Sequence, residues 1–201
     1  MKKNFLKKSG KEIISQPIKG TSKRNLVDAE KDDDLKSKLI NSPKEKSEHV
    51  MIVDLVRNDL SKICKEGSVN VKELFGIYTF PQVHQMISTV RGEVDNQIHW
   101  TEIVDACFPM GSMTGAPKKR VMELIEKYES GPRGLFSGSI GYITPDFDFD
   151  FNVVIRSVFY NSTTQYLSFK AGGGITNLSD LEEEYKESCL KVEAIIKVLN
   201  T

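Results

Sequence analysis

The chain has 201 residues, of which 39% are hydrophobic and 28% are charged, and this composition predicts one globular domain with a sizeable core. Acidic and basic residues number 28 each, which argues against binding to nucleic acid or to an anionic membrane surface. No stretch approaches the roughly 20 apolar residues of a membrane span, and the basic start MKKNFLKKSG lacks the apolar region of a signal peptide. Cys64, Cys107 and Cys189 are odd in number and widely spaced, so we expect reduced thiols and a cytoplasmic protein.

The first third of the chain carries signals for two strands, a charged segment and one long helix. The stretch NFLKKSGKEIIS predicts two short strands around a Ser-Gly turn. Residues 22–41 are mostly charged, so we expect a mobile, solvated excursion with a short helix near residues 33–40. Ser42 as N-cap, Pro43 at the first helical position and Glu45 three residues after the cap predict a helix that runs to about residue 64.

The remainder of the chain mixes predicted strands with two further helices. Glycine, asparagine and proline signals separate apolar stretches that predict strands at residues 76–80, 84–94, 138–145, 151–161 and 165–173. Helices are predicted at residues 116–130, opened by Pro117, and at residues 179–200, which have a Ser-x-x-Glu start. Strands in series with a few long helices predict an α+β fold with a largely antiparallel sheet.

Two glutamates lie on the inward face of the helix that starts at Ser42. This face carries, in order, Glu45, Glu48, Ile52 and Leu55. Spacings of 3, 4 and 3 residues place these side chains on one helical stripe whose apolar half must face the core. Carboxylates that continue such a face need partners, and a metal ion is a common one. The simpler interpretation is that Glu45 only completes a capping box.

The last predicted helix repeats this arrangement. Its predicted inward stripe consists of Leu181, Tyr185, Ser188, Val192, Ile195 and Leu199. Glu184 lies beside the stripe and Glu187 lies one turn further along, so two helix starts together offer four carboxylates to a hard cation, for which Mg²⁺ fits best. The alternative is a solvated acidic face near a positive helix end, with Glu182 as the capping partner of Ser179.

Several glycine and arginine positions are candidates for binding anions. Gly172, Gly173 and Gly174 leave backbone N–H groups accessible to an anion, although a wide turn explains three glycines almost as well. The loop MGSMTGAPKKR at residues 110–120 enters a helix with the same anion-binding logic. Arg156 interrupts an apolar strand, where an arginine either extends to an edge or holds a carboxylate.

Lys19 and His84 have ordinary structural explanations when each is taken alone. Lys19 lies between a Pro-Ile pair and a glycine, and lysine is rarely buried, so it is most simply a solvated turn residue. His84 falls on one face of a predicted strand, where a lone histidine is more often structural than catalytic, although its titration range suits catalysis.

The order of the motifs resembles that of the chorismate-using enzymes. The blocks are QPIKGT, EHVMIVDLVRNDL, VHQMISTVRG, MGSMTGAPKKRVMELI, GSIGYI, VVIRS and AGGGIT followed by EEEYKES, and the resemblance covers residues 5–201. The family includes anthranilate synthase component I, aminodeoxychorismate synthase component I, and the isochorismate and salicylate synthases. Anthranilate synthases carry alanine at the third position of Pro-Ile-x-Gly-Thr and aminodeoxychorismate synthases carry lysine, so Lys19 makes this chain similar to the latter.

The resemblance implies conversion of chorismate, with ammonia from a glutaminase partner, to 4-amino-4-deoxychorismate for p-aminobenzoate and folate synthesis. In that enzyme type Lys19 is implied to attack C2 of chorismate as the C4 hydroxyl leaves, after which ammonia adds at C4 and expels the lysine. A rigid Pro/Gly frame would aim this nucleophile. The alternatives are another chorismate-converting enzyme, such as anthranilate synthase component I, and a non-catalytic module that binds chorismate or a glutaminase partner.

The resemblance also implies roles for the other candidate residues. The implied catalytic residues are Lys19, Thr21 and His84. The implied Mg²⁺ ligands are Glu45, Glu48, Glu184 and Glu187. The implied substrate-binding residues are Ser112, Phe136, Arg156, Gly172, Gly173 and Gly174, and among these Arg156 and the Gly174 backbone would hold the enolpyruvyl carboxylate. The implied fold is a two-sheet antiparallel α/β sandwich with the active site between its layers.

The resemblance has one departure, at its start. Family members carry a Ser-Pro-Glu block directly before the strand that begins Phe-Leu, and its glutamate is implied to protonate the leaving hydroxyl. Here MKKN precedes Phe5 and Leu6, with Lys3 at the position of that glutamate. Residues 1–201 are therefore similar to the C-terminal portion of a chorismate-binding domain, as expected of a fragment, a truncated reading frame or one half of a split enzyme.

Overall fold

The computed structural model describes residues 4–177 and 179–200, and the chain divides into two compact units. Within the described residues, the first unit runs to Glu129 and includes Ser139–Val153, while the second consists of Ser130–Gly138 and the residues from Val154 onward. The single domain predicted from the composition is thus built from two separately packed parts. Lys3, where the resemblance places a departure, lies outside the described residues.

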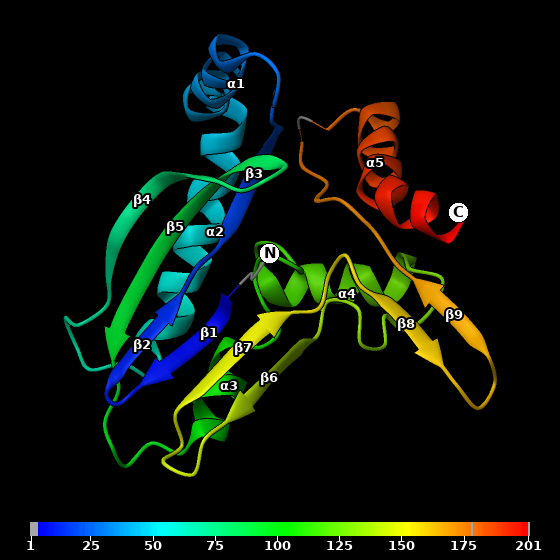
Figure 1. Ribbon diagram of the computed structural model, residues 1–201. Coiled ribbons are helices and arrows are strands. Elements are labelled where there is room, and N and C mark those ends of the chain that lie inside the picture. The colour runs from blue at the N-terminus through cyan, green and yellow to red at the C-terminus, as the bar shows by residue number, and fades with distance from the viewer. Residues whose placement is uncertain (1–3, 178, 201) are drawn as a thin grey trace. The chain divides into compact units, whose positions relative to one another are not determined.

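The first unit is organised around an antiparallel sheet of seven strands (Figure 1). These strands are β1 (Asn4–Ser9), β2 (Glu12–Ser15), β3 (Ile18–Lys23), β4 (Asn70–Thr79), β5 (Val83–Glu93), β6 (Ser139–Ile143) and β7 (Phe149–Val153). Their order is β3-β5-β2-β1-β7-β6, and β4 also pairs with β5. Every pairing between described strands is antiparallel, which confirms the predicted α+β class.

The long strand β5 organises the sheet, because β4 pairs with one of its edges and β3 and then β2 pair with the other. The register of β3 on β5 shifts between Ile18 and Thr21. Lys19 and Gly20 therefore lie in an irregular part of β3, where Gly20 has a φ of 88°. Glycine adopts this left-handed conformation at little cost, and any other residue would be strained there.

The helix α2 (Pro43–Ser61) packs on one face of this sheet (Figure 1). Its predicted start is confirmed, because the Ser42 hydroxyl accepts the Glu45 N–H at 3.3 Å and Pro43 occupies the first turn. The buried apolar side chains of α2 and the strands include Leu6, Ile13, Ile52, Val53, Leu60, Met86 and Val90. These side chains form the core that fixes α2 against β5 and β3.

The charged segment at residues 22–41 contains a longer helix than expected. α1 (Ala29–Asn41) replaces the short helix predicted near residues 33–40, and the Asp28 side chain caps it by accepting the Lys31 N–H at 3.1 Å. Asp32, in the first turn of α1, is buried rather than solvated. Its partners lie outside the helix, so the local composition could not indicate that burial.

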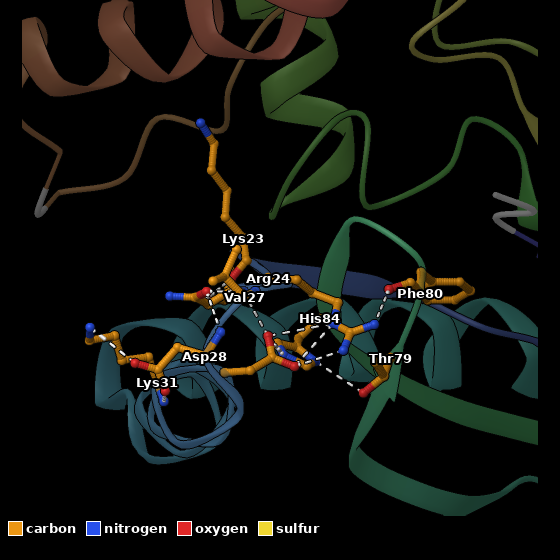
Figure 2. A network of polar contacts seen from close by, with 11 residues as sticks. Lys23, Arg24, Val27, Asp28, Lys31, Thr79, Phe80 and His84 are labelled. Carbon is orange, nitrogen blue, oxygen red and sulfur yellow. Dashed lines mark hydrogen bonds and ion pairs between the residues drawn. The ribbon is translucent and has the colours of Figure 1, made fainter.

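Asp32 joins α1 to the sheet through a network of polar contacts (Figure 2). Its carboxylate accepts from Arg24 Nη2 at 2.8 Å, from the Asn25 N–H at 2.8 Å and from His84 Nε2 at 3.0 Å. The other ring nitrogen of His84 lies 3.0 Å from Thr79 Oγ1. The Arg24 guanidinium is the main cause that lowers the pKa of Asp32 from 3.8 to about 2, against the opposing effect of burial.

Two further helices complete the first unit. α3 (Trp100–Cys107) was not predicted, although its start has a capping box in which the His99 ring accepts from the helix start and Glu102 accepts the His99 N–H at 3.1 Å. α4 (Lys118–Tyr128) follows Pro117, as predicted. Among the helices of the described ranges, none combines the length and the apolar character needed to cross a bilayer.

The second unit contains a hairpin of β8 (Val158–Asn161) and β9 (Tyr166–Phe169), followed by α5 (Leu181–Leu199). The continuous strand predicted at residues 151–161 is wrong, because β7 ends at Val153 and β8 belongs to a different sheet. Arg156 lies between them with a φ of 52°. That left-handed backbone ends the extended conformation, and no apolar pattern in the sequence signals it.

The start of α5 differs from the prediction by one residue. Asp180 is the N-cap, and its side chain accepts the Glu183 N–H at 3.1 Å. The predicted capping pair of Ser179 and Glu182 is therefore wrong. Aspartate and serine are nearly equivalent N-caps, so adjacent candidates cannot be separated without the backbone geometry.

The predicted inward stripe of α5 is also wrong at its first turns. Leu181 and Tyr185 are 82% and 69% exposed, whereas Glu184 is buried. Helical spacing correctly identifies which residues share a face, but the neighbouring segments decide which face is covered.

Leu60 is completely buried in the core between α2 and the sheet. We expect the substitution Leu60→Ala to lower the free energy of unfolding by about 2–5 kcal/mol, because it removes buried methyl groups and leaves a cavity. Urea unfolding followed by circular dichroism would measure this loss. The matched change Leu26→Ala, at a side chain that is 71% exposed, should cost no more than about 0.5 kcal/mol; equal losses at both positions would contradict the described core.

The lowered pKa of Asp32 predicts a specific dependence of stability on pH. Because the folded-state pKa of about 2 lies below the ordinary value of 3.8, the ionised form stabilises the fold above pH 4, and that contribution disappears as the pH falls from about 4 to about 2. In Asp32→Asn, the free energy of unfolding should therefore decline less steeply over this range. Urea unfolding at a series of pH values would test this, with Asp33→Asn, at an exposed position in the same helix, as the control.

Candidate active site

Lys19 and Glu48 form an ion pair between β3 and α2. Lys19 Nζ lies 2.6 Å from Glu48 Oε2, and the two side chains are only 26% and 12% exposed. Partial burial reduces the screening that weakens ion pairs at a protein surface. The interpretation of Lys19 as a solvated turn residue is therefore wrong, because the lysine lies in a strand and its amine points at a carboxylate.

Glu45 lies one helical turn before Glu48 and faces the same part of β3. A methyl group on Gly20 would lie 3.0 Å from Glu45 Oε2 and 3.1 Å from a methyl carbon of Leu39. Glycine at this position thus allows β3 to approach α2 closely enough for both carboxylates to lie beside Lys19 and Gly20. The Ser42 N–H, which a capping box would direct to the Glu45 side chain, donates to the Leu39 carbonyl at 3.3 Å.

Thr21, two residues after Lys19, is held by a residue that the sequence did not indicate. Gln85 is 1% exposed on β5 directly opposite Thr21, and its Nε2 donates to Thr21 Oγ1 at 3.2 Å. Because the hydroxyl oxygen accepts this hydrogen bond, its own proton can be donated elsewhere. The only signal for Gln85 was its place beside His84, since a glutamine in a strand indicates no particular function.

The hydrogen bonds of the His84 ring go to partners other than Lys19. Both ring nitrogens of His84 are engaged with Asp32 and Thr79, as described above, and the side chain is 2% exposed. The histidine beside Lys19 is His49, which directly follows Glu48 and which no pattern in the sequence indicated. Its Nδ1 lies 3.2 Å from the Lys19 carbonyl oxygen.

Ser112 lines a cavity of about 30 Å³ that also touches the segment before Lys19. Gln16 and Pro17 contribute to its wall, as do Asp59 and Cys107. This volume holds on the order of one or two water molecules, so the cavity is too small for a ring-sized ligand. The cavity thus places Ser112 beside Gln16 and Pro17, the segment directly before β3.

Cys64, which is half-buried, and Cys107, which is buried, are not candidate nucleophiles. Burial raises the pKa of Cys64 to about 11 and that of Cys107 to about 12, so both thiols stay protonated near neutral pH. Cys107 also lies in the field of Asp59, which is ion-paired with Lys118 Nζ at 2.6 Å. In the first unit this leaves the Lys19 amine as the nucleophile best placed for chemistry.

In the second unit, Gly173 and Glu184 lie against one another. Glu184 is buried, and its Oε1 accepts from Ser179 Oγ at 2.7 Å. A methyl group on Gly173 would lie 3.1 Å from Glu184 Oε2, whereas methyl groups on Gly172 or Gly174 would meet no atom within 4 Å. Of the three glycines, only Gly173 is thus explained by a close approach.

The other candidates of the second unit lie in different surroundings. Glu187 pairs with Lys191 at 2.8 Å, and Lys191 also donates to the Gly172 carbonyl at 3.0 Å. Arg156 is exposed between β7 and β8, and Phe136 is half-buried. Phe136 belongs to the short segment at residues 130–138 that packs with this unit.

The four candidate metal ligands are divided equally between the two units. Glu45 and Glu48 belong to the first unit, and Glu184 and Glu187 belong to the second. Across residues 4–177 and 179–200, no three histidine, cysteine or acidic side chains gather into a metal site. The donor chemistry nevertheless fits Mg²⁺, which prefers carboxylate oxygens and usually keeps several waters. In each unit a glycine, Gly20 or Gly173, leaves room beside one of these carboxylates.

Comparison with known proteins finds relatives that cover nearly all of the chain. A sequence profile of chorismate binding enzymes matches residues 3–197. A probable aminodeoxychorismate synthase from the chloroplast of Oryza sativa is 44% identical over 187 residues, covering 93% of this chain and 21% of that protein. The aminodeoxychorismate synthase component 1 of Escherichia coli is 41% identical over 195 residues, covering 97% of this chain and 42% of that protein.

The fold also has a counterpart among solved structures. Anthranilate synthase component I from Streptococcus pneumoniae superimposes with a TM-score of 0.78 at 29% identity, over 94% of this chain and 41% of that one. The chain thus spans less than half the length of each of these three proteins. Because the family profile covers nearly all of the sequence, the chain belongs to the family of chorismate binding enzymes.

Proposed function

We propose that this chain carries the chorismate-converting site of an aminodeoxychorismate synthase. The reaction replaces the C4 hydroxyl of chorismate with an amino group from ammonia, which a glutaminase subunit supplies, on the way to p-aminobenzoate and folate. The observation that carries the proposal is the position of Lys19, a shielded amine held against Glu48 in an irregular part of β3. Relatives named aminodeoxychorismate synthase, at 41% and 44% identity, support it.

In the proposed reaction, the uncharged amine of Lys19 attacks C2 of chorismate. The ring double bonds shift, the C4–O bond breaks, and the proton lost from the amine balances the proton that the hydroxyl takes up to leave as water. Ammonia then adds at C4, and the return shift of the double bonds breaks the bond between C2 and Lys19. Glu48 is placed to hold the lysine side chain in one direction. Fixing the direction of a nucleophile relative to its target greatly raises the rate of the attack.

We further propose that Glu45, Glu48, Glu184 and Glu187 bind Mg²⁺, some of them through water. When bound, the metal would hold the ring carboxylate of chorismate and neutralise charge that develops during the displacement. The fit of the carboxylate donors and the space beside Gly20 and Gly173 support this assignment.

The remaining candidates complete the proposed pocket. Arg156 and the backbone of Gly174 would take the enolpyruvyl carboxylate, since a guanidinium suits bidentate pairing with a carboxylate. Thr21, Ser112 and Phe136 would lie near the ring. For His84 we propose an indirect role, because both of its ring nitrogens are already engaged. The three free thiols fit a reducing compartment, which we propose to be the cytoplasm.

Two alternative functions can be distinguished from the proposed one. An anthranilate synthase is favoured by the fold match to the Streptococcus pneumoniae enzyme but not by the lysine in Pro-Ile-Lys-Gly-Thr. A non-catalytic module would bind chorismate with Mg²⁺, or bind only a glutaminase partner, without turnover.

The proposed nucleophile predicts loss of product in Lys19→Ala. With chorismate, Mg²⁺ and ammonium, the unchanged chain should form 4-amino-4-deoxychorismate, and Lys19→Ala should form it at least about a hundredfold more slowly. Mass spectrometry of the products would measure this. Lys23→Ala is the matched control, since Lys23 lies on the same strand and extends away from the polar network in Figure 2.

Each product pattern in this experiment has a distinct meaning. Anthranilate from Lys19→Ala would support close kinship with anthranilate synthases. Equal product from Lys19→Ala and the unchanged chain would exclude the lysine adduct. Binding of chorismate by the folded, unchanged chain without any product would support the non-catalytic alternative.

The proposed metal site predicts that Gly173→Ala weakens Mg²⁺ binding. The added methyl group would lie 3.1 Å from Glu184 Oε2, so the carboxylate must move by a few tenths of an ångström. Because displaced ligands typically lose affinity, we expect a dissociation constant on the order of tenfold higher in isothermal titration calorimetry. Gly172→Ala meets no atom within 4 Å and should bind as the unchanged chain does. Equal affinities in all three proteins would remove Glu184 from the proposed site.

A further inference from the structure

His49 connects α2 to two strands through both nitrogens of its ring. The side chain is completely buried. Its Nδ1 lies 3.2 Å from the Lys19 carbonyl oxygen in β3, and its Nε2 lies 2.7 Å from Ser88 Oγ in β5. The residue directly before it, Glu48, is the one that holds the Lys19 amine. Two consecutive residues of α2 therefore contact the backbone and the side chain of the same lysine.

The partners of His49 fix the direction of these hydrogen bonds. A carbonyl oxygen can only accept, so Nδ1 carries the proton that is donated to Lys19. In the uncharged ring Nε2 then accepts, and the Ser88 hydroxyl must donate to it. The oxygen of Ser88 in turn accepts the Phe75 N–H at 3.0 Å. A hydrogen-bond chain with one direction thus runs from Phe75 through Ser88 and His49 to the carbonyl of Lys19.

The start of this chain is set by an irregularity in β4. Phe75 has a φ of 59°, and the register of β4 on β5 shifts between Glu73 and Gly76. This departure from regular pairing directs the Phe75 N–H to Ser88. The Phe75 ring also packs against the His49 ring, with the centroids 5.7 Å apart and the planes at 70°. The imidazole is therefore held by packing as well as by its hydrogen bonds.

The end of the chain falls where β3 lacks regular pairing. Lys19 lies between Ile18 and Thr21, the two residues that bracket the register shift on β5. His49 provides a partner for the Lys19 carbonyl at this place. A fixed carbonyl limits rotation about the lysine backbone and so limits the directions in which the side chain can leave the strand.

We propose that His49 is a positioning residue for Lys19, holding its carbonyl through the Nδ1–H tautomer while Glu48 holds its amine. The inference rests on the proposed function, because the direction of the amine matters only if Lys19 attacks the substrate. His49 itself takes no part in proton transfer to the substrate. The buried His84, shown in Figure 2, is a natural comparison, since it donates from its other nitrogen, Nε2, to the Asp32 carboxylate.

Nitrogen NMR of the unchanged chain tests the hydrogen-bond chain without any assay of activity. Long-range ¹H–¹⁵N spectra of the three histidines should show His49 protonated at Nδ1 and His84 protonated at Nε2, with exposed His99 as the reference. A His49 ring protonated only at Nε2 would overturn the inference. The ¹³C resonance of the Lys19 carbonyl should move in His49→Gln, which places its amide near Nε2, and should move less in His49→Asn, which keeps an N–H donor near Nδ1.

Kinetics of the same variants test the positioning role. We expect kcat to fall on the order of 10–100-fold in His49→Gln, with KM changed less than about twofold, because a misaimed nucleophile slows the chemical step rather than binding. His49→Asn should restore most of kcat. Equal kcat in the unchanged chain and both variants would overturn the inference. If the unchanged chain gives no product, the proposed function fails, and the tautomers and the Lys19 carbonyl resonance then decide the inference on their own.

Discussion

Between Ile18 and Thr21, β3 leaves its regular pairing with β5, and the candidate site depends on this short departure. A lysine in a regular antiparallel ladder would have its backbone fixed by the neighbouring strand. Here the left-handed Gly20 turns the strand toward α2, so that Lys19 takes its partners from a helix. The candidate site forms because Glu48 and His49 of α2 lie beside this irregular segment of β3.

The position of α2 depends in turn on the apolar core beneath it. Ile52, Val53 and Leu60 are buried against the sheet, and the cap at Ser42 sets where the helix begins. If the sequence of α2 were shifted by one residue along the helix, its side chains would rotate by about 100°, and Glu48 would no longer point at β3. The capping residue and the buried leucine are therefore as important for the site as the charged groups themselves.

The two buried histidines show how neighbours decide the chemistry of identical side chains. His84 faces the Asp32 carboxylate and His49 faces a backbone carbonyl, and each has a hydroxyl at its second nitrogen. Both partners that face the rings accept hydrogen bonds, but they approach opposite nitrogens. The rings are thus held in opposite tautomers, one joining α1 to the sheet and the other joining α2 to the strand of Lys19.

Two of the candidate metal ligands, Glu45 and Glu184, each lie against a glycine. Gly20 and Gly173 lie in different units, and in each a side chain would press against an acidic oxygen. In both places the missing side chain lets the backbone approach a carboxylate closely. A side chain on Gly172 or Gly174 would meet no atom within 4 Å, so close packing explains only the middle glycine of the three.

The sequence by itself determined the class of fold, the main elements and the family. Ser42 and Pro43 marked the start of α2 correctly because capping is a local interaction, and the ordered motifs identified a chorismate binding enzyme. Strand signals found most of the sheet but missed the break at Arg156, whose left-handed backbone has no local signature.

Only the tertiary structure decided which partners the polar residues take. The burial of Asp32, the pairing of Lys19 with Glu48 and the role of Gln85 beside Thr21 all join residues far apart in the sequence. The sequence singled out His84, because its strand pattern was clear, and passed over His49 in the middle of a helix. Local propensity depends on neighbouring residues in the sequence. A hydrogen bond between two elements depends instead on strand register and helix rotation, and these are set only when the core packs.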